Sequence, residues 1–227
     1  LGAAVVAGQS GSVRWVVFAG LLFVYWFFIF IIPVPGAGRN SYVLFENLVY
    51  WIDDIVTGNA KRWGYLYPLI TSTAVVVFGT IVGSRLTRST SRGGFMRTLA
   101  IWGAAGIVLG LALHPSTPII KRMFTPSYTL LTCGISCMVF LVLYWITDVR
   151  GHRAWSFPFI VVGANSIFVY MLNGLLGGWL TQTAGVLLVP VAGLLGAWTA
   201  PLQEVMRLAA EWLVCLWLYK RGIFFKL

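Results

Sequence analysis

The sequence predicts an all-α protein: a polytopic integral membrane helical bundle with about six transmembrane helices plus interfacial or re-entrant segments. Of its 227 residues, 59% are hydrophobic and only 10% are charged, with 11 Trp and 15 Phe. So few polar groups cannot cover the water-facing surface of a soluble domain. The apolar residues also gather in runs of about twenty, the length that a helix needs to cross the roughly 30 Å hydrocarbon core of a bilayer.

The formal net charge of +10 at pH 7 comes from Lys and Arg in short clusters between the apolar runs. This pattern sets membrane topology and does not indicate nucleic-acid binding. The partners that the composition predicts are the lipid bilayer and other transmembrane segments, with no nucleic acid. Cys133, Cys137 and Cys215 lie inside apolar runs without metal-ligand neighbours. They predict helix packing and no metal site.

We expect residues 1–227 to form a single transmembrane domain. The six predicted spans are residues 13–32, 66–84, 98–113, 127–147, 157–173 and 201–219. The first ends at Pro33, and the last ends at a basic cluster from Lys220 onward, which suits a helix end that meets anionic headgroups. Residues 174–200 are apolar, rich in Gly and interrupted by Pro190, and they predict a re-entrant or interfacial region.

The longest polar connection contains residues 42–55, whose apolar residues recur at helical spacing with three acids to one side. These acids are Glu46, Asp53 and Asp54, half of the chain's 6 acidic residues. The pattern predicts a helix lying at the membrane interface. Two pairs of glycines spaced four residues apart predict close helix packing. The pairs are Gly79 with Gly83 in the second span and Gly106 with Gly110 in the third.

The basic residues predict the orientation of the bundle. Six spans place the larger group on one face: Arg14, Arg85, Arg88, Arg92, Arg97, Arg150, Arg153, Lys220, Arg221 and Lys226. The smaller group on the other face is Arg39, Lys61, Arg62, Lys121 and Arg122. The excess predicts both termini of this chain in the cytoplasm, with a bacterial inner (cytoplasmic) membrane as the expected location. Leu1 and the absence of a signal-peptide pattern after it predict a piece of a longer protein or a processed product.

Residues 157–173 form a predicted apolar helix that nevertheless carries Asn165, Ser166, Tyr170 and Asn173. Polar side chains at membrane depth cost free energy unless they find partners or serve a function. At this spacing they share one side of a helix, where amide, hydroxyl and phenol groups can bond a carbonyl or a sugar hydroxyl. The alternative is an interhelical clamp that contributes about 0.6 to 2 kcal/mol.

Four motifs occur in order along the chain: residues 118–128 (PIIKRMFTPSY), 144–151 (YWITDVRG), 163–170 (GANSIFVY) and 219–225 (YKRGIFF). In order and spacing, they resemble the C-terminal half of the heparan-alpha-glucosaminide N-acetyltransferase family of transmembrane acyltransferases. The resemblance implies an enzyme that takes an acetyl group from cytosolic acetyl-CoA and passes it across the membrane to an amino sugar or glycan acceptor. It implies acetyl-CoA as acyl donor and no metal. The substrate-binding residues that we expect are Asn165, Ser166, Tyr170, Asn173, Lys121 and Tyr128.

The chain also departs from that family. The family's catalytic His belongs to N-terminal helices that have no counterpart here, so the catalytic residues are unknown. Residues 62–65 replace an acidic residue followed by Pro-Glu-Gly, and Asn173 stands where some members carry His. Two hypotheses follow. The chain is the C-terminal part of an acyltransferase completed by an N-terminal half, or it is a non-catalytic accessory or structural subunit. The expected protein partners are that N-terminal half or other transmembrane subunits, in a homodimer or a larger membrane complex.

Overall fold

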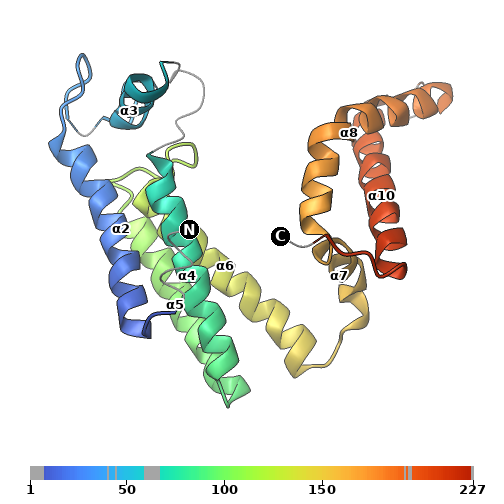
Figure 1. Ribbon diagram of the computed structural model, residues 1–227, viewed down its shortest axis with the longest axis horizontal. Helices are drawn as coiled ribbons and strands as arrows, with labels where there is room; N and C mark the ends of the chain where they lie inside the picture. Colours follow the sequence, from blue (N-terminus) through green and yellow to red (C-terminus); the bar gives the residue numbers. More distant parts are fainter. Residues whose placement is uncertain are drawn as a thin grey trace. The chain divides into compact units, whose positions relative to one another are not determined.

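The computed structural model describes residues 8–39, 41–43, 45–58, 67–191, 193 and 196–225, and it confirms the all-α fold. Within these residues the only β pairing is an isolated bridge between Val34 and Gly38. The chain divides into two compact units, Leu1–Val149 and Arg150–Leu227 (Figure 1), whereas the sequence predicts a single domain. We call them unit 1 and unit 2 and describe each by itself.

The helices described in unit 1 begin where the sequence supplies helix-starting residues. They are α2 (Gly11–Ile31), α3 (Leu48–Thr57), α4 (Pro68–Arg88), α5 (Arg92–Ala112) and α6 (Pro126–Tyr144), the last followed by a π-helical turn, Trp145–Val149. Pro68 and Pro126 open their helices at a position where no backbone donor is needed. Asn47 caps α3, because its side-chain oxygen accepts from the backbone N–H groups of Val49 and Tyr50.

Unit 2 contains α7 (Phe157–Gly163), α8 (Ser166–Leu188) and α10 (Thr199–Lys220). Short 3₁₀ turns lie at Ala154–Ser156, Val189–Val191 and Gly196–Trp198. The helix α10 packs against both α7 and α8. The side-chain amide nitrogen of Gln203 in α10 donates to the Thr181 carbonyl of α8 over 2.6 Å. These contacts hold α7, α8 and α10 together.

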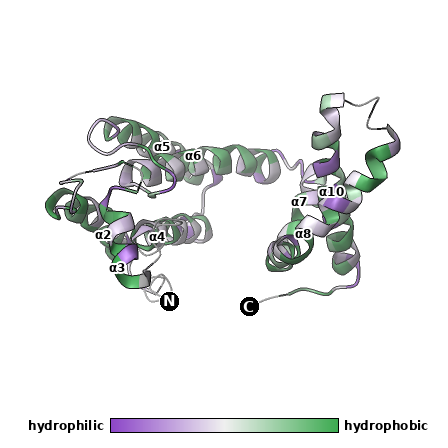
Figure 2. Ribbon diagram, turned by 90° about the horizontal axis from the view of Figure 1, so that it is seen from above, coloured by the Kyte–Doolittle hydropathy of each residue, from purple (hydrophilic) through white to green (hydrophobic). Residues whose placement is uncertain are grey.

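Among the described residues, four helices are long and apolar enough to cross a membrane: α2, α4, α5, and α6 with its π-helical turn. Figure 2 shows these helices as predominantly hydrophobic. A fifth crossing results if α7 and α8, bent by 64° at their break, count as one span. The chain is therefore an integral membrane protein. The predicted sixth span, residues 201–219, is helical as α10, but Glu204, Arg207 and Glu211 occupy its middle and it does not meet the same criterion.

Three other boundaries differ from the sequence prediction. The predicted helix at 157–173 breaks at Ala164 and Asn165. The helix α8 then continues to Leu188, through much of the region predicted to be re-entrant, because a helix bonds its own backbone groups where water is scarce. The interfacial helix begins at Leu48 instead of residue 42, since Phe45 has a φ of +66°, outside the helical region. Lys61, residues 62–65, Leu66 and Lys226 lie outside the described residues.

Aromatic side chains connect three helices of unit 1. The Trp15 ring of α2 meets Phe78 of α4 and Trp102 of α5 edge-on, with ring centroids 6.0 and 5.2 Å apart. Phe18 of α2 also packs on Phe78, at 5.4 Å. Such edge-on contacts stabilise aromatic pairs by about 0.5–1.5 kcal/mol beyond simple burial. The aromatic group therefore joins α2 and α4 to α5.

Glycines bring α5 and α6 into direct backbone contact. A Cβ atom placed on Gly134 of α6 would lie 2.6 Å from the backbone nitrogen of Ile107 in α5. One placed on Gly110 would lie 2.7 Å from the backbone nitrogen of Leu131, and one on Gly106 would lie 2.9 Å from the Cα of Gly134. The predicted packing at Gly106 and Gly110 is thus confirmed. The matching prediction for Gly79 and Gly83 is wrong, because added Cβ atoms there would meet nothing within 4 Å.

We predict that Gly134→Ala lowers the free energy of unfolding by about 1–3 kcal/mol, because the added methyl group meets backbone atoms that cannot move independently. The matched control is Gly79→Ala, which adds the same methyl group in open space. It should be neutral or stabilising by up to about 1 kcal/mol through helix propensity. Denaturant titration of the detergent-solubilised protein, followed by circular dichroism, measures both. Equal effects of the two substitutions would contradict the assigned contact.

Candidate functional site

The centre of the predicted site, Asn165, lies at the break between α7 and α8 and is fully buried. Its backbone (φ −130°, ψ 37°) is not helical. Its side-chain nitrogen donates to the Ile223 carbonyl over 3.1 Å, and its side-chain oxygen accepts from the Phe225 N–H over 3.0 Å. Both ends of the amide are therefore engaged by the segment that follows α10.

Two further contacts hold this arrangement together. The Phe225 ring stacks on Phe168 of α8 with centroids 5.2 Å apart and an interplanar angle of 18°. The indole N–H of Trp212 in α10 donates to the Pro158 carbonyl of α7 over 3.1 Å. The segment 223–225 is thus fixed beside the break by both polar and aromatic contacts. Asn165 therefore acts as a clamp between the α7–α8 break and the segment that follows α10. A clamp is the alternative to substrate binding that the sequence leaves open for this residue.

Ser166, Tyr170 and Asn173 do share one side of α8, as the spacing predicts. All three line an open groove of about 870 Å³ along that helix. Tyr170 is 84% exposed, and the other two side chains are also exposed. Val169 and Leu175 supply apolar lining beside them. The groove therefore offers a hydroxyl, a phenol and an amide without any formal charge, which is suited to hydrogen-bonding a neutral polar group.

The remaining two predicted site residues, Lys121 and Tyr128, belong to unit 1. Lys121 is exposed at the start of a turn, and its carbonyl accepts from the Phe124 N–H over 3.2 Å. Phe124 has a φ of +52°, and its ring meets Tyr128 of α6 edge-on at 5.4 Å. Beside this turn, the Thr125 hydroxyl donates to the Pro118 carbonyl over 2.8 Å. The motif at residues 118–128 thus encodes a tightly bonded turn that leads into α6.

A buried tyrosine pair at the α3 end of unit 1 was not predicted from the sequence. The Tyr67 hydroxyl donates to the Tyr25 carbonyl, and the Tyr25 hydroxyl donates to the Met123 carbonyl, each over 2.6 Å. The two tyrosine rings lie 4.5 Å apart. Burial raises the pKa of Tyr67 above its ordinary value, with the nearby Tyr42 acting in the same direction. The only sequence signal for such a pair would be a tyrosine within one span and another beside the start of a second span, which is too common to single it out.

Among the described residues, no group of three or more His, Cys, Asp or Glu side chains is arranged to hold a metal ion. Comparison of the chain with known protein families and with characterised proteins finds no match. The site therefore rests on the geometry of the residues themselves and on the motif resemblance.

We predict that Asn165→Ala destabilises unit 2 by about 1–3 kcal/mol, since it leaves the Ile223 carbonyl and the Phe225 N–H without their partner. Hydrogen exchange at Phe225 should become faster, which mass spectrometry of the C-terminal peptide would report. The control is Asn173→Ala, which removes an exposed amide from the same helix and should leave exchange unchanged. Slow exchange at Phe225 in both variants would show that Asn165 is not the clamp.

We predict that alkaline pH weakens unit 1 through Tyr67. Its folded pKa lies above the unfolded value of about 10, so this contribution to stability is fully present below that pH and is lost as pH rises through the folded pKa. Thermal unfolding at about pH 8 and about pH 11 measures the loss. At about pH 8, the Tyr67→Phe variant should unfold at a lower temperature than the unchanged protein. Its unfolding temperature should fall less than that of the unchanged protein when the pH is raised to about 11. An identical pH dependence in the variant would exclude Tyr67 as a source.

Proposed function

We propose that this chain is the C-terminal part of a membrane acyltransferase that moves an acetyl group from cytosolic acetyl-CoA to an amino sugar or glycan acceptor across the membrane. The catalytic His is expected in an N-terminal half. The observation that carries the proposal is the groove along α8, where Ser166, Tyr170 and Asn173 lie together within an apolar helix. The four motifs over residues 118–225, one of which contains Ser166 and Tyr170, also support it.

The groove residues would bind substrate and would not perform the proton transfers. Hydroxyl, phenol and amide groups can hold an acyl carbonyl or a sugar hydroxyl by hydrogen bonds. All of the lining residues belong to α8 and Tyr170 is 84% exposed, so a substrate bound here would contact this one helix face of the chain. Asn165 takes a positioning role in this proposal. Its engagement with Ile223 and Phe225 fixes the point at which α8 and its polar side begin.

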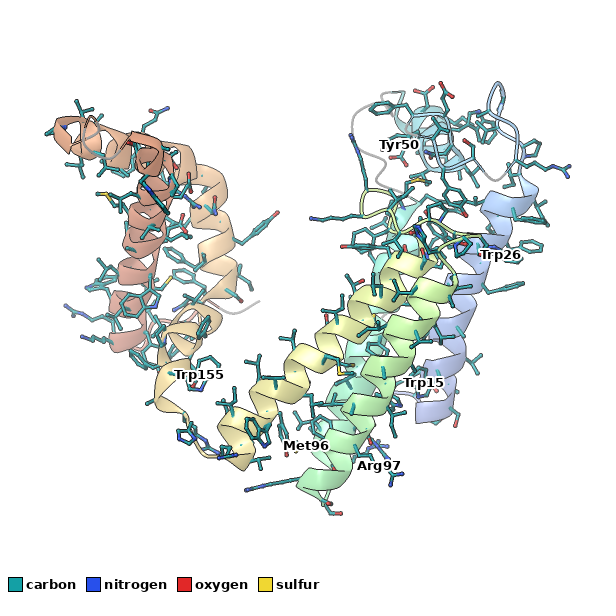
Figure 3. All side chains as sticks on the ribbon, turned by 180° about the vertical axis from the view of Figure 1, so that it is seen from behind. Trp15, Trp26, Tyr50, Met96, Arg97 and Trp155 are labelled. Carbon is teal, nitrogen blue, oxygen red and sulfur yellow. The ribbon has the colours of Figure 1, made fainter. Side chains whose placement is uncertain are left out.

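The proposed orientation has the arginine-rich end of unit 1 in the cytoplasm of a bacterial cell. Arg85 and Arg88 lie in the last turn of α4, and Arg92 opens α5. Arg97 and Tyr50 lie toward opposite ends of unit 1 (Figure 3). Clusters of Arg beside membrane spans favour the cytoplasmic face. With the bent α7–α8 pair and α10 both crossing the membrane, both termini of this chain are cytoplasmic, and α3 lies at the opposite membrane surface.

The alternative is a non-catalytic accessory or structural subunit of a larger membrane complex. Two observations favour it. Both ends of the Asn165 amide are bonded within the chain, and the outer face of α8 is apolar and exposed, with Trp179 at 61% and Val186 at 71% exposure. A second membrane subunit would cover such a surface. Lipid tails would cover it equally well.

We predict that Tyr170→Phe and Asn173→Ala, made in the protein together with its N-terminal half, each reduce kcat/KM for acetyl transfer by about 5- to 100-fold. This range corresponds to the loss of one hydrogen bond, roughly 1–3 kcal/mol. The assay follows radiolabelled acetyl transfer from acetyl-CoA to glucosamine. Gln182→Ala is the control, because Gln182 is exposed on α8 and does not line the groove. Unchanged transfer in both groove variants would favour the accessory role.

A further inference from the structure

A second pocket lies at the α3 end of unit 1. It has a volume of about 290 Å³, enough for a small ligand or for part of a larger one. One wall is the turn at residues 34–37. The other wall is formed by residues between 45 and 54, which belong to the segment before α3 and to α3 itself. The proposed function uses none of these residues.

The charged residues that line this pocket are Glu46 and Asp54, and both are acidic. Their side chains are exposed, and neither forms an ion pair with another described residue. The sign is unusual for this chain, which carries 16 Lys and Arg against 6 acids. An unpaired pair of carboxylates in a basic protein favours a positively charged ligand.

Aromatic rings supply the rest of the pocket's recognition surface. Phe45, Tyr50 and Trp51 all line it, and the rings of Phe45 and Tyr50 lie 5.0 Å apart. The Arg122 guanidinium already lies against these two rings, 5.3 Å from the Phe45 centroid and 5.9 Å from the Tyr50 centroid. Arg122 is not a lining residue of the pocket. A guanidinium thus already contacts part of this aromatic surface, and the Trp51 ring offers a further face for a cation.

The Tyr50 hydroxyl is a polar group that nothing in the described part of the chain satisfies. Tyr50 is only 3% exposed, and its hydroxyl oxygen is buried with no hydrogen-bond partner among the described residues. Leaving a buried hydroxyl unbonded costs about 1–3 kcal/mol. A ligand with a hydroxyl, ester or phosphate oxygen next to its charged group would satisfy it.

A purely structural role for the acids has less support. An acid just before a helix stabilises the helix N-terminus, which is where Glu46 lies. However, the N–H groups of Val49 and Tyr50 are already bonded by the Asn47 side chain, and Asp54 lies toward the other end of α3. Helix stabilisation therefore does not explain why both carboxylates line the same pocket.

We propose that this pocket binds an organic ammonium group. Glu46 and Asp54 hold the ammonium, the rings of Trp51 and Phe45 contact the attached carbon atoms, and the Tyr50 hydroxyl bonds a neighbouring oxygen. Two sources share this chemistry: the headgroup of an ethanolamine or choline lipid, and a soluble amine. The proposal stands without acyl transfer, because binding is measured with no acyl donor present.

The test uses the whole chain in nanodiscs of phosphatidylglycerol, which has no amine. Isothermal titration with ethanolamine and with choline should show saturable binding, while ethylene glycol, which has no charge, should show none. Glu46→Gln combined with Asp54→Asn should weaken ammonium binding by about tenfold or more, the loss expected for one ion pair of roughly 1.4 kcal/mol. Asp148→Asn is the matched control, since Asp148 is an acid of unit 1 outside the pocket.

Nanodiscs containing phosphatidylethanolamine separate the two sources. A retained lipid, detected by native mass spectrometry and lost in the double variant, assigns the pocket to a headgroup. Binding of soluble amines alone assigns it to a free amine. Should the double variant not fold, Trp51→Leu keeps both carboxylates and should weaken choline binding by about two- to fivefold. Absence of binding to both sources, or binding that the variants leave unchanged, would overturn the proposal.

Discussion

The backbone contact between α5 and α6 is the constraint on which unit 1 depends. Apolar surface gives helices little reason to associate inside a bilayer, because lipid tails solvate it as well as another helix does. Close approach is then a main source of attraction, and the glycines at positions 106, 110 and 134 permit it. Once these two helices are joined, Trp102 of α5 meets Trp15 of α2. Trp15 in turn contacts Phe78 of α4, so α2 and α4 are connected to α5. The aromatic core is thus built on a contact made by residues that have no side chain.

Unit 2 is organised by a different kind of interaction. Its helices α8 and α10 carry few glycine contacts, and polar groups make the connections instead. Gln203 bonds the Thr181 carbonyl, Trp212 bonds the Pro158 carbonyl, and Asn165 bonds the segment after α10. Each of these is a side chain that bonds a backbone atom on another element. Such bonds specify one arrangement, because a shift of one residue would leave a buried amide without a partner.

The sequence was sufficient to predict where the long helices lie, but it was not sufficient to predict where a helix breaks. Hydrophobic runs predict α2, α4, α5 and α6 closely, since each must span the same thickness of hydrocarbon. The break at Asn165 could not be predicted, because it depends on Ile223 and Phe225, far along the chain. The glycine pair at 79 and 83 has the same spacing as the pair at 106 and 110, and only the choice of neighbouring helix distinguishes them. For the candidate site, spacing alone placed Ser166, Tyr170 and Asn173 on one side of α8, whereas the unpartnered Tyr50 hydroxyl depends on tertiary packing.

The Asn165 clamp has a consequence for biogenesis. Its two partners lie 58 and 60 residues downstream, so α7 and α8 leave the ribosome well before the groups that complete their bend have been made. During that interval the amide of Asn165 must be satisfied by water or by the insertion machinery, because hydrocarbon offers no hydrogen bonds. The bend between α7 and α8 is therefore fixed only after synthesis has reached Phe225. Ribosomes stalled before that residue would hold a chain whose last helices are present but not yet locked together.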